Sequence, residues 1–420
     1  MSISSKRLLA GALVSAGYLC SATASAACTT NLGAVMSLTG SLGVLGQQIA
    51  KGAQLGVADI NSAGGANGCD LKLSLLDDQT SPSVGVDAAK KLADVEHVPA
   101  IIGALSSGVS TAILTSVTAN KLVQISPAST SPTFTDLAKD GKTGGYWFRT
   151  VPSDALQGVA MAKVAHDAGL KKVAVMYLNN PYGQGLNKEF SNAFKKLGGT
   201  VTENVVYNPN QPSYRAEVDK AASPKPDALF LIGYPGDGTT ITREWISAGA
   251  PQAFLFPDGL ESQDFVNDVG ARYMKTVHGT APGSTKSPSL QTFQDEYKAK
   301  YGEVPTQAYI TNAYDAAVIV GLAIDEAKST DPAAIRDTIR KVTDPKGEKI
   351  HAGPAQLKQA VALLKQGKPV DYIGATGPMQ FDQYGDIEAP MAVWTVADGK
   401  VRQTGDVTVQ QIAQIDEKMK

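Results

Sequence analysis

The sequence predicts an α/β protein built from doubly wound parallel sheets in two lobes. Its 420 residues exceed what a single core usually holds, which favours two lobes. Short apolar runs alternate with segments of helical spacing along most of the chain, the order typical of parallel sheets covered by helices. Polar or aromatic side chains follow several of these runs. The carboxyl ends of parallel strands share one edge, so these side chains are expected to face a common crevice.

The composition excludes some classes of partner. Hydrophobic residues make up 43% and charged residues 19%, as in an ordinary globular protein. The net charge of -2 gives no reason to expect nucleic acid or an anionic membrane surface as a partner. Beyond the N-terminus, no segment reaches the roughly 18 apolar residues of a membrane span.

Residues 1–26 are predicted to be a cleaved export signal. Residues 6 and 7 are basic, residues 8–19 are apolar, and residues 24–26 have the A-x-A pattern of a cleavage site. We therefore expect a periplasmic protein. A lipid anchor would need Cys20 or Cys28, and neither follows a leucine and two small residues.

Two cysteines remain after the signal, Cys28 and Cys69. Each stands just before an expected strand, over residues 32–38 and 71–76. If these strands are parallel neighbours, both sulfur atoms lie at one edge of the sheet. Outside the cytoplasm a disulfide is favoured over two buried thiols. In the chain-entropy model it contributes on the order of 4 kcal/mol.

Strands and helices alternate in two series. A proline at residue 152 follows the first series and marks a plausible exit from the first lobe. The segment 277–283 is a second candidate crossing, and residues 377–387 have a hairpin-like pattern. The other expected strands cover residues 100–105, 122–125, 146–149, 173–177, 201–207, 228–232, 253–256 and 391–396, and expected helices include residues 156–168, 185–197, 290–301 and 306–328.

The stretch 100–119 carries the clearest candidate for a ligand site. The apolar run ends at Ser106-Ser107-Gly108, and helical spacing follows. A helix start leaves backbone N–H groups free, and together with the helix dipole they attract an anion. The alternative is that Ser106 is an ordinary helix cap. Similar side chains at other strand ends favour a ligand: Thr130, Tyr182, Tyr234 and Asp258.

No motif in the sequence requires catalysis. Gly141-Lys142-Thr143 resembles the end of a P-loop, but Asp136 stands where that motif needs glycine. The four histidines lie far apart without metal-binding spacing, and there is no Gly-x-Ser-x-Gly elbow. We expect no enzymatic activity, no catalytic residue, no metal and no cofactor.

A series of fragments runs along nearly the whole mature chain. They are residues 37–40, 52–65, 77–78, 125–130, 148–150, 182–185, 314–316 and 374–378. In order and spacing they resemble the periplasmic leucine/isoleucine/valine-binding family, whose members serve ABC importers. The resemblance implies two lobes joined by a three-strand hinge that closes on a ligand. It places residues 27–152 and 281–389 in lobe 1, and residues 153–280 and 390–420 in lobe 2.

The resemblance also implies the residues of the site. The family's carboxylate-binding serine and threonine match Ser106 and Thr130, with the backbone of Ala128 and Ser129 beside them. Its acid for the ligand's ammonium matches Asp258, unless this residue only caps the next turn through Gly259. Where the family often has an aromatic residue, this chain has Val44 and Leu45. Further matching contacts are Asp154 at the first crossing, Tyr182 and Tyr234 from lobe 2, and Tyr309 near the hinge.

These observations predict an exported receptor that captures a small ligand, an aliphatic amino acid, and delivers it to an ABC permease of the inner membrane. One alternative is a receptor for amides or aromatic acids. Another is a ligand-sensing domain for a signalling partner. We expect a monomer that binds no nucleic acid.

Overall fold

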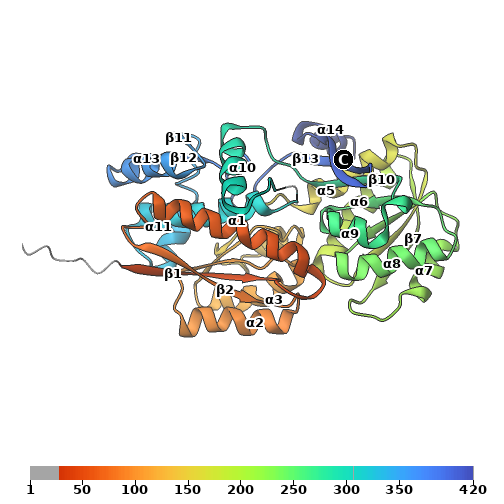
Figure 1. The fold of residues 1–420 in the computed structure, drawn as a ribbon, viewed down its shortest axis with the longest axis horizontal. Helices are drawn as coiled ribbons and strands as arrows, with labels where there is room; N and C mark the ends of the chain where they lie inside the picture. The colour runs from red at the N-terminus through yellow and green to blue at the C-terminus, as the bar shows by residue number, and fades with distance from the viewer. Residues whose placement is uncertain (1–27, 306, 420) are drawn as a thin grey trace, which may run out of the picture.

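The computed structural model describes residues 28–305 and 307–419. It contains two large sheets side by side, each flanked by helices (Figure 1), and a small parallel pair of strands, β11 (Glu348–His351) with β12 (Val370–Ile373). The α/β class with parallel-sheet lobes that the sequence predicts is confirmed. The predicted export signal and Cys20 lie outside the described residues. Within the described part of the chain, no helix is long and apolar enough to cross a membrane.

The first sheet has five parallel strands in the order β2-β1-β3-β4-β5. They are β1 (Thr29–Met36), β2 (Asp70–Asp77), β3 (Ala100–Gly103), β4 (Val123–Ser126) and β5 (Trp147–Arg149). The chain winds in opposite directions from β1, so the sheet has its topological switch point between β1 and β3. In open α/β sheets a crevice forms there, outside the carboxyl ends of the strands.

Alternate residues of these strands face two helical layers, as the pleat of a strand requires. Ala34 and Ile102 belong to the core shared with α1 (Gly43–Ser62) and α11 (Ile310–Ala327). Val35 and Ile101 pack with α2 (Pro82–Lys90) and α3 (Ser107–Ala119) on the opposite face. Figure 1 shows α2 and α3 along one side of the sheet and α1 along the other. The first lobe also contains η1 (Gly40–Leu42), η2 (Lys91–Val95) and α4 (Thr133–Lys139).

A later part of the chain completes the first lobe. The α1 and α11 helices approach closely because α1 carries glycines at the contact. A Cβ added at Gly52 would lie 2.1 Å from the carbonyl oxygen of Ile310. Tyr314 donates a hydrogen bond to Asp59 across the same contact, 2.6 Å between oxygens. This part comprises α10 (Pro288–Tyr301), α11, α12 (Pro332–Ile339), β11 (Glu348–His351), α13 (Pro354–Lys365) and β12 (Val370–Ile373).

The second sheet has seven strands in the order β14-β13-β10-β9-β8-β6-β7. The β6 to β10 strands pair in parallel, whereas β13 is antiparallel to both β10 and β14. The strands are β6 (Lys172–Leu178), β7 (Thr200–Tyr207), β8 (Ala228–Ile232), β9 (Ala253–Phe256), β10 (Thr276–Pro282), β13 (Met391–Ala397) and β14 (Lys400–Val407). The helices of this lobe are α5 (Asp154–Asp167), α6 (Pro181–Lys196), α7 (Arg215–Ala222), α8 (Pro235–Ser247), η3 (Asp258–Leu260), α9 (Gln263–Val269), η4 (Ala271–Tyr273) and α14 (Val409–Met419).

The chain passes between the two sheets three times, after β5, after β10 and before β13. The β10 strand continues to Pro282, so the lobe boundary expected at residues 280 and 281 falls inside this strand. The hairpin-like pattern at residues 377–387 gives a turn and no strand pair. The reason is that this segment bonds to β5: Arg149 donates its N–H to Gly385 and its guanidinium binds Asp386, with 2.7 Å between Nε and Oδ1.

The disulfide that the sequence predicts is confirmed. Cys28 and Cys69 are bonded, with their Cα atoms 4.8 Å apart. The next residues, Thr29 and Asp70, are paired in the parallel register of β1 and β2. Both cysteines therefore stand at the same edge of the sheet, as adjacent parallel strands require.

We expect reduction of this disulfide to lower the free energy of unfolding by about 4 kcal/mol, because the bond limits the entropy of the unfolded chain. Urea unfolding with and without dithiothreitol measures the difference. The double variant Cys28→Ser, Cys69→Ser is the control and should resemble the reduced protein, with no response to dithiothreitol. Equal midpoints for the oxidised and reduced protein would contradict the expectation.

Candidate functional site

A small cavity of about 20 Å³ lies between the two lobes, at the carboxyl ends of the strands. The first lobe contributes mainly aliphatic side chains to its wall. The second lobe contributes two tyrosines and an acid. The lining residues are Leu42, Leu45, Ile49, Leu105, Ser107 and Ala128 from the first lobe, Tyr182, Tyr234, Asp258 and Gly259 from the second, and Tyr309 just before α11. One end of the cavity is therefore apolar and the other is acidic.

Asp258 is the acid of this cavity and is only 3% exposed. It follows β9 at the start of η3, where the strand end delivers it to the cleft. Tyr182 donates a hydrogen bond to one carboxylate oxygen at 3.0 Å, and Tyr309 donates to the other. Burial raises the pKa of Asp258, and the hydrogen bonds from the tyrosines oppose that rise.

Asp154 is a second buried acid close to the first. It is the first residue of α5 and is fully buried, and its N–H donates to the Thr130 carbonyl at 2.8 Å. Neither oxygen of its carboxyl group has a hydrogen-bond partner among the described residues. Burial raises the pKa of Asp154 well above its usual range, and the charge of Asp258 raises it further. Two carboxylates in this position favour a cation between them or a proton on one of them.

Ser106 stands at the N-cap position of α3, and its hydroxyl makes no capping bond. It bonds instead across the cleft, accepting from the Tyr234 hydroxyl at 3.2 Å. The helix that starts here leaves its first backbone N–H groups without intrahelical partners. Ser107, the first residue of the helix, lines the cavity. The Thr130 hydroxyl is buried without a hydrogen-bond partner among the described residues.

The loop after β4 brings Ala128 to the cavity and turns Ser129 away from it. The Ser129 hydroxyl bonds inward, to the Leu105 carbonyl at 3.1 Å and to the Ser110 hydroxyl at 2.8 Å. These bonds brace the loop against the start of α3. Ser129 is therefore a support of the site rather than part of its wall.

The lobes touch directly around the cavity. On the second-lobe side, the Tyr182 and Tyr234 rings stack on each other with their centroids 5.6 Å apart, and Tyr234 then reaches Ser106 of the first lobe. Ser41 of the first lobe donates to Asp237 of the second at 3.2 Å, and Ser131 donates to the Pro181 carbonyl at 2.8 Å. Together with the Ser106–Tyr234 and Tyr309–Asp258 bonds, these contacts describe a closed cleft.

Several wall residues were not identified from the sequence as candidates. Leu42, Ile49 and Leu105 have the apolar spacing of ordinary core residues, which gives no signal of a cavity. Val44 and Leu45 stand where the family often has an aromatic residue, and of these two Leu45 lines the cavity. Val44 does not, because the helix turns it outward, where it is 47% exposed.

A metal-binding role has no support in the described part of the chain. Among those residues, no group of three or more His, Cys, Asp or Glu side chains is placed to hold a metal ion. The donors and acceptors around the cavity suit an organic ligand with separate charged ends.

Comparison with known proteins identifies the family. A family model described as periplasmic binding protein matches residues 29–400. A Leu/Ile/Val-binding protein homolog of Brucella melitensis is 28% identical over 88% of this chain and 92% of its own length. A chemotactic signal transduction system substrate-binding protein of Halobacterium salinarum, BasB, is 29% identical over 81% of this chain and 80% of its own.

The crystal structure of a leucine-binding protein of Thermotoga maritima, LivK, is similar throughout. Its TM-score is 0.77 at 26% identity, and the match covers 91% of this chain and 99% of that chain. The resemblance noted in the sequence is thereby confirmed. The chain belongs to the leucine/isoleucine/valine-binding family of periplasmic binding proteins.

Proposed function

We propose that this protein is an exported receptor that binds an aliphatic α-amino acid between its lobes and delivers it to an ABC permease. It acts in the periplasm as a monomer and releases its ligand chemically unchanged. Membership of the family supports the receptor role. The names of the Brucella and Thermotoga relatives support a branched-chain amino acid as the ligand.

The observation that carries the proposal is the placement of opposite polarities around one apolar cavity. Asp258 is a buried carboxylate that pairs with no cation among the residues the structure describes, and it suits the ligand's ammonium group. The start of α3 offers N–H groups without intrahelical partners to the ligand's carboxylate, and the Thr130 hydroxyl, which has no hydrogen-bond partner among the described residues, is a further donor. Leu42, Leu45 and Leu105 then surround an aliphatic side chain.

Binding requires the lobes to separate and close again. A cavity of about 20 Å³ holds little more than one water molecule, which needs roughly 10–15 Å³. We infer that the three crossings act as a hinge between the two lobes. The ligand favours a closed form in which the lobes leave room for it, because it touches both lobes only there.

The cavity disfavours the alternative ligands. An aromatic acid or an amide has no cation for Asp258, and an unpaired buried carboxylate is costly. A sensory role is a second candidate, supported by the name of the Halobacterium relative. It uses the same cleft, and it differs in the protein that docks on the closed form.

A thermal-shift screen of ligand-stripped protein tests the receptor role. Leucine, isoleucine and valine at about 100 times their Kd should add roughly 2.7 kcal/mol of stability, a shift of several degrees. The comparison set consists of the matched amides, benzoate and isovalerate, which is a branched acid without the amine. These compounds should shift the midpoint less. If no compound raises the midpoint, or if isovalerate exceeds leucine, the proposal is wrong.

Two variants test recognition of the ligand's ammonium group and of its carboxylate group separately. Asp258→Asn keeps the shape of the side chain and removes the charge, so amino-acid affinity should fall by about two to four decades. Ser106→Ala should cost less, about 1.5–3 kcal/mol, because backbone donors still hold the carboxylate. Asp264→Asn, on an exposed residue of α9, is the matched control and should bind as the parent does. Calorimetry decides: unchanged affinity in Asp258→Asn would exclude the zwitterion.

Hinge closure predicts a change of shape in solution. Small-angle scattering should give a smaller radius of gyration with saturating leucine than for stripped protein, because the lobes come together on the ligand. Asp258→Asn at the same leucine concentration serves as the control and should keep the radius of the stripped form. Equal radii for the parent protein with and without leucine would contradict hinge closure and indicate a pocket that does not change shape.

A further inference from the structure

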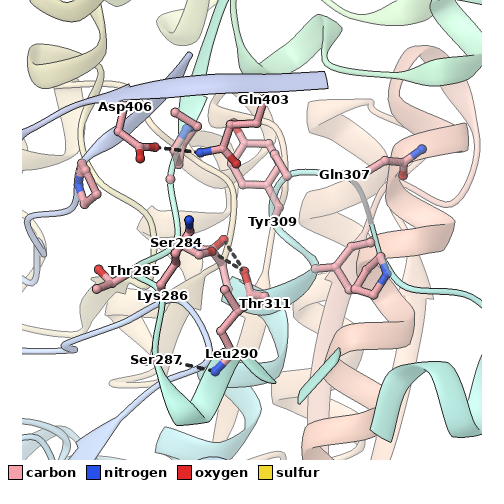
Figure 2. A pocket seen from close by; sticks show the side chains of 18 of the residues that line it. Ser284, Thr285, Lys286, Ser287, Leu290, Gln307, Tyr309, Thr311, Gln403 and Asp406 are labelled. Carbon is pink, nitrogen blue, oxygen red and sulfur yellow. Dashed lines mark hydrogen bonds between the residues drawn. The ribbon is translucent and has the colours of Figure 1, made fainter. Parts of the chain in front are cut away.

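A second pocket, of about 790 Å³, lies over two of the three crossings between the lobes. It is much larger than the cleft cavity and shares only Tyr309 with it. Figure 2 shows Ser284, Thr285 and Lys286 on one side of it and Gln403 and Asp406 of β14 on another. Its volume falls in the range of roughly 300–1,000 Å³ that is typical of small-molecule sites.

Both lobes contribute to the wall, and its chemistry is mixed. Leu290 and Thr311 come from the first lobe, and Gln403 comes from the second. Its apolar surfaces come from Pro282, Leu290 and Pro390. Hydroxyl and amide groups lie between them, from Ser284, Thr285, Gln291, Thr311 and Gln403. Such a wall suits a molecule with an aliphatic part and a polar end.

Glu261 provides the charged group of this pocket. It follows η3, lines the pocket and is only 9% exposed. Its side chain forms no hydrogen bond and no ion pair within the described part of the chain, and its carboxylate oxygens are not among the buried atoms there that lack a partner, so they are accessible from the pocket. Burial raises the pKa of Glu261 to about 8, and the nearby charge of Asp258 adds to the rise. The other charged residues that line the pocket are Lys286 and Asp406.

We propose that this hinge pocket is a second ligand site, which binds a small primary alkylamine through an ion pair between the ammonium group and Glu261. The alkyl chain lies along Pro282, Leu290 and Pro390. A metal ion fits less well, because no group of three or more acidic, His or Cys side chains is placed for one among the described residues. The site goes beyond the amino-acid cleft and does not depend on it.

Calorimetry with n-butylamine at pH 9 tests the site, because at that pH Glu261 has lost its proton and the amine keeps its own. Asp258→Asn should keep butylamine binding, with any change far smaller than in Glu261→Gln, which separates the hinge pocket from the cleft. n-Butanol, the uncharged comparison, should give no binding. Glu261→Gln should lower the affinity for butylamine at least tenfold, and Asp264→Asn should leave this affinity unchanged.

The pH profile of the parent protein is an independent measurement that needs no variant. Between pH 7 and pH 9 the affinity for butylamine should rise about tenfold, as the proton on Glu261 stops competing with the ammonium. A flat profile, equal affinity in Glu261→Gln, or loss of binding in Asp258→Asn would each overturn the proposal. None of these results bears on leucine binding, so the two proposals fail separately.

Discussion

Asp258 is a carboxylate that the protein buries between its two lobes, and in the described part of the chain its side-chain partners are hydroxyl groups and no cation. Two tyrosines from different parts of the chain donate to it, Tyr182 from α6 and Tyr309 from the loop before α11. Their bonds offset part of the cost of burial, and the remainder favours a cation in the cleft. Asp154, buried nearby with no hydrogen-bond partner for its carboxyl group among the described residues, increases this preference.

The topology of the sheets explains why these groups meet. Each sheet has a switch point where the strand order reverses, between β1 and β3 in the first lobe and between β6 and β8 in the second. Strand ends at a switch point diverge and leave a crevice. Because the two crevices face each other, Leu105 and Ser107 after β3 meet Tyr234 after β8 and Asp258 after β9.

The crossings between the lobes are tied to the same network. Arg149 at the end of β5 is fully buried, and its guanidinium bonds to Asp386 and to the carbonyl of Ser131. Ser131 in turn donates to Pro181 of the other lobe. The loop that carries Thr130 is therefore held on one side by Arg149, which is anchored to Asp386, and on the other by the second lobe. Movement of the lobes would act directly on this loop.

Much of this structure could be predicted from the sequence because it depends on local order. Apolar runs followed by helical spacing predicted the parallel sheets, and Cys28 and Cys69 could be paired because each precedes a neighbouring strand. The strand ends also identified Asp258, Tyr182 and Tyr234 as candidates. The prediction of a hairpin at residues 377–387 was wrong. The Gly385 carbonyl in this segment accepts a hydrogen bond from Arg149 of β5, which is more than 200 residues away in the sequence.

The sequence by itself determined the class of fold, the family and the acidic residue that faces the cleft. Tertiary structure alone decided which way each side chain points. Ser129 bonds inward, and Ile49 reaches the cavity although its spacing is that of a core residue. Glu261 is a charged residue in a loop, and only the packing of both lobes around it removes it from water. Burial depends on distant contacts, so residue type and local spacing cannot predict it.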